Sequence, residues 1–183
     1  MKVSVYIATT LDGFIARKDG SLDWLPGSDG EVDPELEGED FGYAEFTSTV
    51  DVLIMGRNTY ELVLSFGEWP YGDKRVIVIS STLKSLCDTL PSNVELRSCS
   101  VQELHAEMQQ SGAKHLYIDG GKTIQSLLKA ELITDLILAR VPVLIGEGIP
   151  LFGSLNQDIL LHHNTTQSFK NGFVQSHYQP KKP

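Results

Sequence analysis

Two apolar runs in this chain end in glycine at the point where a helical pattern begins. The run VDVLIMG (50–56) leads into RNTYELV, and the run HLYIDGG (115–121) leads into KTIQSLL. A third run, RVIVIS (75–80), is nearly all apolar and β-branched, which is typical of a strand buried on both faces. Strands that alternate with helices in this way indicate a mostly parallel sheet with helices packed on it.

The other elements follow from local signals. Ser100 and Glu103 form a capping box before an apolar helical stripe that stops at Gly112. Lys-Asn-Gly at 170–172 separates two strand-like runs and predicts an antiparallel hairpin. Pro142 lies inside a long apolar run, so we expect a bulge or a bend there. The remaining predictions are strands at 3–8, 94–98 and 135–146 and helices near 40–49, 58–66 and 120–132.

Length and composition are those of one ordinary globular domain. The chain has 183 residues, of which 41% are hydrophobic and 21% are charged. Together with the order of the elements, this predicts an α/β fold in which residues 1–183 form a single three-layer domain. Its sheet would be mixed but mostly parallel, flanked by helices, with an antiparallel hairpin at the C-terminus.

Charge and cysteine usage narrow the range of partners. The formal net charge of −9 argues against nucleic acid or an anionic membrane as the main partner. No apolar run approaches the roughly 18 residues of a membrane span, and the start of the chain is too short and polar for a signal peptide. Cys87 and Cys99 form no metal spacing, and no histidine motif suggests a metal. We therefore expect a cytoplasmic protein with a small-molecule substrate and no metal.

The first strand-to-helix turn is a candidate anion site. A helix N-terminus presents free backbone N–H groups and partial positive charge, both of which favour anions. Within Gly56-Arg57-Asn58-Thr59 the arginine adds a fixed cation and the threonine a hydroxyl donor. This stretch therefore has the chemistry of one half of a phosphate site.

The second turn repeats this logic. Gly120 and Gly121 would let a diphosphate approach the backbone closely, although a simple tight turn explains the pair equally well. Position 116 is a leucine, so the P-loop spacing fails, and no Rossmann fingerprint is present. Hydroxyl side chains follow a third strand at 80–82. Since the C-terminal ends of parallel strands share one edge, the pattern favours a ligand with separated phosphates, such as NADPH.

The order of these motifs resembles a known superfamily. ATTLDGFIA, DW, LIMGRNTYE, RVIVIS, IDGGKTI and VPVLIGEGIPLF follow one another as in the dihydrofolate reductase-like superfamily. The resemblance covers about residues 2–178 and is closest to the branch named for the C-terminal reductase domain of bacterial riboflavin biosynthesis. It implies NADPH as cofactor, with Arg57 at the 2′-phosphate. The cofactor-binding residues that it implies are Ala8, Gly56, Arg57, Thr59, Ser80, Ser81, Gly120, Gly121, Lys122 and Thr123.

The resemblance gives two candidate acids on the substrate side. Asp40 falls where dihydrofolate reductases carry an acid on the first helix, with Glu45 as an alternative, and a raised pKa would let it supply a proton. The simpler interpretation is a solvated acidic loop. Asp12 matches the Leu-Asp-Gly of the riboflavin branch, near the substrate, although Asp-Gly is also a strong turn signal. Trp24, Gly146 and Gly148 are the further substrate-side residues that the resemblance implies.

We therefore expect an NADPH-dependent reductase that transfers a hydride to a ribosylaminopyrimidine-like or other small heterocyclic substrate. The riboflavin reductases carry a different stretch where this chain has GRNTYE, so neither family's substrate can be carried over directly. The alternatives are dihydrofolate reductase activity and a catalytically silent NADPH-binding module; phosphoryl transfer lacks its motifs. The resemblance also implies a homodimer, which the apolar strand 136–145 would form through a sheet edge.

Overall fold

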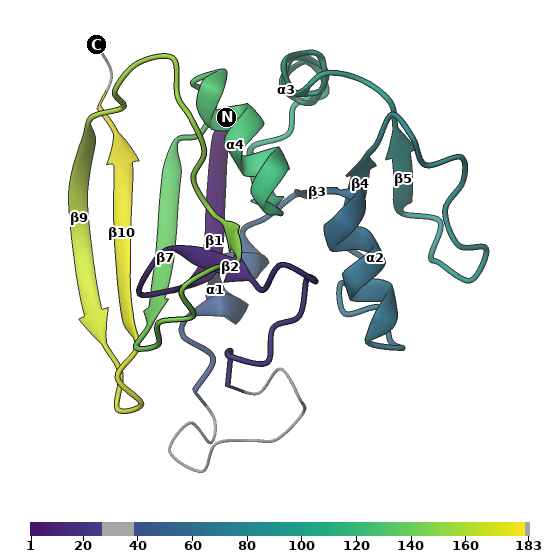
Figure 1. Cartoon of the computed structure of the whole chain (residues 1–183). Helices are drawn as coiled ribbons and strands as arrows, with labels where there is room; N and C mark the ends of the chain where they lie inside the picture. Colours follow the sequence, from purple (N-terminus) through teal and green to yellow (C-terminus); the bar gives the residue numbers. More distant parts are fainter. Residues whose placement is uncertain (27–38, 182–183) are drawn as a thin grey trace. The chain divides into compact units, whose positions relative to one another are not determined.

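The computed structural model describes residues 1–26 and 39–181 (Figure 1). The chain divides into two compact units. The first unit comprises Met1–Ser4 and Val50–Ile133, and the second comprises Val5–Thr49 and Thr134–Pro183. Within the described ranges, none of the helices has the length and apolar character needed to cross a membrane. That all 183 residues behave as one domain stays a prediction.

The first unit is built on parallel strands. Its sheet has the order β5-β4-β3-β6, and each neighbouring pair is parallel. The chain returns to the start of each new strand through a helix or a loop, as a parallel sheet requires. The elements are β3 (Val52–Gly56), α2 (Arg57–Ser65), β4 (Arg75–Ile79), β5 (Val94–Arg97), α3 (Val101–Gln110), β6 (His115–Asp119) and α4 (Gly121–Lys129).

The core of the first unit confirms the expected double-sided burial. Val76, Ile77 and Val78 in β4 are all fully buried, so both faces of that strand are covered. The predicted capping box is present at the start of α3, where the Ser100 hydroxyl accepts from the Glu103 N–H and the Glu103 carboxylate accepts from the Ser100 N–H. These two bonds satisfy N–H groups that the helix leaves free.

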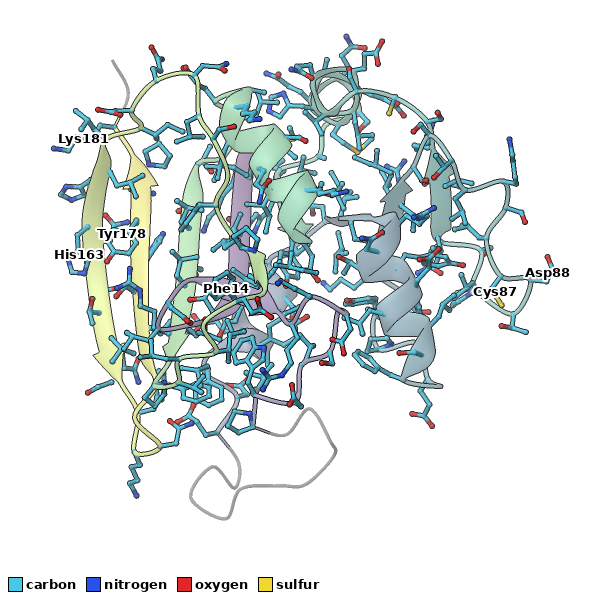
Figure 2. The ribbon with its side chains drawn as sticks, in the orientation of Figure 1. Phe14, Cys87, Asp88, His163, Tyr178 and Lys181 are labelled. Carbon is cyan, nitrogen blue, oxygen red and sulfur yellow. The ribbon has the colours of Figure 1, made fainter. Side chains whose placement is uncertain are left out.

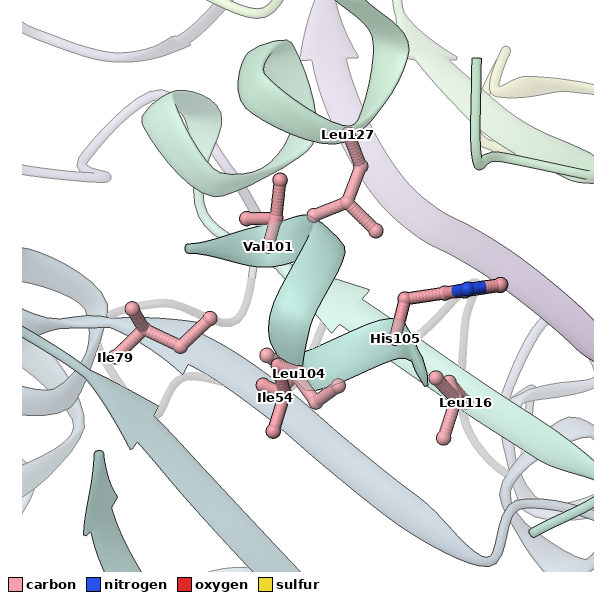
Figure 3. A pocket seen from close by; sticks show the side chains of 7 residues that line it. All are labelled: Ile54, Ile79, Val101, Leu104, His105, Leu116 and Leu127. Carbon is pink, nitrogen blue, oxygen red and sulfur yellow. The ribbon is translucent and has the colours of Figure 1, made fainter. Parts of the chain in front are cut away.

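A small apolar void lies under α3 in this unit (Figure 3). It has a volume of about 10 Å³, and Leu104 of α3, Ile54 of β3 and Leu127 of α4 are among the side chains that line it. Helices α3 and α4 therefore cover the same face of this sheet. His105 also lines this void, which is too small to hold a ligand and is a local packing defect.

The second unit is dominated by antiparallel pairing. Strand β10 is antiparallel both to β7 and to β9, and the C-terminal hairpin is thereby confirmed. On this hairpin the rings of His163 and Tyr178 lie 5.3 Å apart (Figure 2). The elements are β1 (Lys2–Thr10, in this unit from Val5 on), β2 (Phe14–Ala16), α1 (Tyr43–Ser48), β7 (Asp135–Val141), β8 (Ile149–Pro150), β9 (Leu161–Ser168) and β10 (Val174–Pro180).

The strand order corrects one inference about assembly. In this sheet β7 lies between β1 and β10, so it is not an edge strand. The idea that the segment 136–145 pairs two copies through a sheet edge is therefore wrong, because both of its hydrogen-bonding sides are already used. The homodimer itself stays a prediction.

The predicted fold class is confirmed. Strands β3–β6 of the first unit are parallel, the second unit ends in an antiparallel C-terminal hairpin, and helices accompany the strands of both units. Three local details differ from the sequence prediction. The expected helix at 40–49 is shorter, the strand that begins at Asp135 ends at Val141 before the proline, and the short sheet of β2 and β8 was not predicted.

Candidate functional site

Two helix N-termini lie side by side in the first unit. Strands β3 and β6 are parallel neighbours, with Met55 opposite Asp119. Each strand runs into a glycine that starts a helix, Gly56 before α2 and Gly120 before α4. Neither helix has a side-chain cap or an acidic residue in its first turn. The free N–H groups of both helices therefore have no anionic partner from their own first turns.

Glycine is required at both turns because each receives the hydroxyl of the other helix. A Cβ at Gly120 would lie 2.3 Å from Thr59 Oγ1, and a Cβ at Gly56 would lie 2.8 Å from Thr123 Oγ1. Gly120 also has φ of +92°, which side chains rarely adopt. The two threonines are thus packed reciprocally against the opposite turns, and any larger residue would push the two N-termini apart.

A third polar strand end adjoins α2. The Ser80 hydroxyl at the end of β4 is buried and accepts from the N–H groups of Thr82 (3.2 Å) and Leu83 (2.9 Å). Arg57 Nη1 donates to Thr82 Oγ1 at 3.2 Å. The arginine side chain therefore spans from the first position of α2 to the turn that follows β4.

The cations at these helix starts are electrostatically unusual. Arg57 is the first residue of α2 and Lys122 is the second residue of α4. The helix dipole disfavours cations at an N-terminus by roughly 0.3–1 kcal/mol each. Together with the absent first-turn acids, this arrangement makes the pair of N-termini strongly attractive to an anion.

Asp119 is a half-buried acid beside this site. Its Oδ1 accepts from the Gly120 N–H at 2.7 Å, and burial raises the pKa of the carboxyl to about 6. No sequence motif identifies this residue as unusual, because its shift comes from loss of hydration and not from a neighbouring charge.

In the second unit, Asp12 ties two loops together. It accepts from the Thr10 hydroxyl at 2.6 Å and from the N–H groups of Ile145 and Gly146 at 3.2 and 2.8 Å. The Thr10 bond, supported by these backbone donors, lowers the pKa of Asp12. The Gly13 N–H donates a hydrogen bond to the Thr10 carbonyl, so the Asp-Gly pair also forms the turn that its sequence predicts.

Asp40 caps a helix. Its two carboxylate oxygens accept from the N–H groups of Gly42 and Ala44, both at 2.9 Å, where α1 begins. These bonds lower the pKa of Asp40. The expectation of a raised pKa is therefore wrong, because the carboxylate is exposed and receives two backbone donors. Glu45 is exposed in the first turn of the same helix.

Trp24 belongs to the hydrophobic core of the second unit. Only 8% of its surface is exposed, and it clusters with Val141 and Phe173, with Ala8 packed against this cluster. Its indole N–H is buried and has no hydrogen-bond partner. An unpaired buried donor has an energetic cost of about 1–3 kcal/mol, so this nitrogen is a candidate for a ligand contact after local rearrangement.

The two glycines near residue 147 differ in role. A Cβ at Gly148 would lie 2.4 Å from the Ala16 carbonyl oxygen, so this glycine permits the close approach of β8 and β2. Gly146 has φ of +75° with open space around it. Gly148 is therefore explained by packing, whereas Gly146 donates to Asp12 and leaves room on its other side.

Comparison with known proteins identifies the family. The family described as the RibD C-terminal domain matches residues 1–175. This chain belongs to that family. The uncharacterized protein YwjB of Bacillus subtilis is 36% identical over 180 residues, covering 97% of each chain. A crystal structure of a Shewanella sp. PV-4 protein, whose name places it provisionally in riboflavin biosynthesis, has a TM-score of 0.91 and 38% identity over the full length of both chains.

More distant structures share the fold of this RibD C-terminal domain. Dihydrofolate reductase from Enterococcus faecalis, in complex with NADP(H) and RAB-propyl, has a TM-score of 0.67 at 18% identity, covering 99% of this chain and 97% of that one. The deaminase/5-amino-6-(5-phosphoribosylamino)uracil reductase of Thermotoga maritima has a TM-score of 0.69 at 17% identity, covering 98% of this chain and 56% of that one. The family match therefore confirms the branch inferred from the order of the motifs, and these structures show that the chain has the dihydrofolate reductase-like fold.

The structure of this RibD-family chain sorts the predicted residues into two groups. Gly56, Arg57, Thr59 and the Gly120–Thr123 turn converge in the first unit, and Ser80 and Ser81 follow β4 in the same unit. Sequence reasoning named Thr82 only as one of three hydroxyl side chains after the third strand, and it did not single out Asp119. The second unit holds the other predicted residues: Ala8, Asp12, Trp24, Asp40, Glu45, Gly146 and Gly148.

Proposed function

We propose that this member of the RibD C-terminal domain family is an NADPH-dependent reductase. The observation that carries the proposal is the pair of adjacent helix N-termini in the first unit. Both begin at glycines, lack first-turn acids and carry Arg57 or Lys122. A protein gains no stability from cations at these positions, and a bound phosphate compensates for them.

The residues present fit the phosphates of NADPH. The glycines at 56 and 120 leave room for the threonine hydroxyls of the opposite helix, so the two helix N-termini lie close enough together to bind neighbouring phosphates. The free N–H groups of α4, with Lys122, would hold the diphosphate. Arg57 would hold the 2′-phosphate together with Ser81, which is exposed in the turn after β4. The cofactor supplies the hydride when bound.

The proposed substrate is a ribosylaminopyrimidine or a similar small heterocycle. Family membership and the name of the Shewanella relative support this class. Asp12 would act by fixing the loop at Ile145–Gly146, because its lowered pKa favours a carboxylate that accepts hydrogen bonds. Gly146 and the buried indole N–H of Trp24 would then contribute to the shape and polarity of the substrate side.

A second candidate function is an NADPH-binding module without turnover. The observation that favours it is the lowered pKa of both predicted acids, Asp12 and Asp40, which leaves neither suited to donate a proton near neutral pH. Under this alternative the phosphate-binding residues keep their roles, and only the chemical step is absent.

The test is a fluorescence titration of the protein with NADPH and with NADH. Arg57→Ala should weaken NADPH binding by about 10- to 100-fold, the size of a charge-assisted hydrogen bond, and change NADH binding little. Lys129→Ala is the matched control, since it removes one cation from the opposite end of α4. An equal loss for both cofactors in Arg57→Ala would reject the 2′-phosphate assignment.

Turnover separates the two candidate functions. NADPH oxidation should follow addition of a ribosylaminopyrimidine substrate to the wild-type protein, with dihydrofolate as the comparison substrate. Tight NADPH binding without oxidation by either substrate would favour the silent module. Absence of binding to NADPH would reject both functions.

A further inference from the structure

The guanidinium of Arg57 is held on two sides before any ligand is bound. Nη1 donates to Thr82 Oγ1 at 3.2 Å, and Nε lies 3.6 Å from Glu61 Oε1 one helical turn further along α2. The contacts come from two separate elements, the turn after β4 and α2 itself. Because a guanidinium carries its five N–H donors in one rigid plane, the Thr82 hydrogen bond, with the Glu61 carboxylate on the other side, favours one direction for the remaining donors.

The acceptor at Thr82 is itself fixed by the backbone. Ser80 Oγ is buried and accepts from the Thr82 and Leu83 N–H groups, which locks the turn. Thr82 Oγ1 lies 3.4 Å from Ser80 Oγ and therefore has a defined position at the end of this turn. A mobile side chain could not orient Arg57, but a hydroxyl on a locked turn can.

Helix stability does not explain the Arg57–Glu61 pair. Both side chains are about half exposed, and exposed ion pairs contribute little. The arginine also precedes the glutamate, which is the less favourable order along a helix. The effect of the Arg57–Glu61 contact is therefore to orient the guanidinium.

We propose that Thr82 is a positioning residue that presets Arg57 for a 2′-phosphate and so increases the preference for NADPH over NADH; the inference rests on the proposed function. An arginine side chain loses considerable rotamer freedom when it binds a ligand. Holding Arg57 on Thr82 in the free protein removes part of that loss from the binding step. The effect appears only with a ligand that carries the 2′-phosphate.

The test compares Thr82→Val with the conservative Thr82→Ser in the full chain. Valine keeps the shape and removes the acceptor, so the NADPH dissociation constant should rise about tenfold while that of NADH changes less than about twofold. Serine keeps the hydroxyl and should restore most of the preference. If Thr82→Val does not fold, Thr82→Ala removes the same hydroxyl and takes its place.

A double-mutant cycle shows whether Thr82 acts through Arg57. In an Arg57→Ala background, Thr82→Val should change NADPH affinity by less than about twofold, since the group that it positions is gone. Additive losses would overturn the proposal, because Thr82 would then act independently of Arg57. An unchanged NADPH/NADH ratio in Thr82→Val would overturn it too and leave the reductase function standing, whereas a wild-type protein without NADPH preference would overturn both.

Discussion

Replacing Asp119 by asparagine should stabilise the protein at neutral and alkaline pH. Asp119 is half-buried at the end of β6, and loss of hydration raises its pKa from 3.8 to about 6. The structure gives it one backbone donor, the Gly120 N–H at 2.7 Å. Asparagine has nearly the same shape and keeps an acceptor for that N–H, but it cannot ionise. The substitution therefore isolates the free energy of burying the charge.

The expected magnitude follows from the pKa shift. A difference of about 2 pKa units between the folded and unfolded chain corresponds to about 3 kcal/mol, fully expressed above pH 6. The folded state holds the proton more tightly, so wild-type stability is greatest below about pH 4 and falls as pH rises through about 6. Between pH 5 and pH 8 the wild type should lose about 1.5 kcal/mol relative to Asp119→Asn.

Urea unfolding of both proteins at pH 5 and pH 8 measures this difference. Groups that titrate equally in the two proteins cancel, so the change in the stability difference with pH reports on Asp119. A difference that is independent of pH would refute the reasoning, because the carboxyl would then titrate normally in the folded state. A difference that shrinks toward pH 8 would show that the two neighbouring helix N-termini stabilise the ionised form more than burial destabilises it.

Two further predictions concern packing. Gly120→Ala should destabilise the protein by at least about 1–3 kcal/mol and abolish nucleotide binding, because its Cβ would meet Thr59 Oγ1 in a backbone conformation with φ of +92°. Adding Thr59→Ala should restore part of the stability in urea unfolding, and no recovery would mean that backbone strain dominates. Leu104→Ala should cost about 3–5 kcal/mol by enlarging the existing void under α3, whereas Glu107→Ala on the exposed side of that helix should change unfolding little.

Local sequence signals predicted the first unit well because each element carries its own signature there. The apolar run of β4, the Ser100–Glu103 capping box and the two strand-glycine-helix turns all depend on neighbouring residues. Parallel pairing then brings the two glycine turns together without further information. The reciprocal contacts of Thr59 and Thr123 were not predictable, because they depend on the separation between two helices and not on spacing along the chain.

The second unit was harder to predict because its short elements have weak signatures. Strands β2 and β8 have only three and two residues, and their pairing depends on Gly148 approaching the Ala16 carbonyl. The sequence suggested a ligand contact at Trp24 and gave no sign that most of this side chain packs in the core beside Val141 and Phe173. An aromatic residue in a motif looks the same in sequence whether it faces a ligand or a core.

The three acids show why a proton donor cannot be assigned from residue type. Asp12 accepts from the hydroxyl of nearby Thr10 and from N–H groups of a loop more than 130 positions away in sequence. Asp40 accepts from N–H groups at the start of α1, so the pKa of each carboxyl is lowered. Asp119 receives one N–H and loses its hydration, so its pKa is raised. Each carboxyl is thus set by the balance between donors gained and water lost, which only the folded chain determines. Water lost outweighs donors gained only at Asp119, so this carboxyl holds its proton up to about pH 6, whereas the carboxyls of Asp12 and Asp40 ionise at a lower pH than is usual for aspartate.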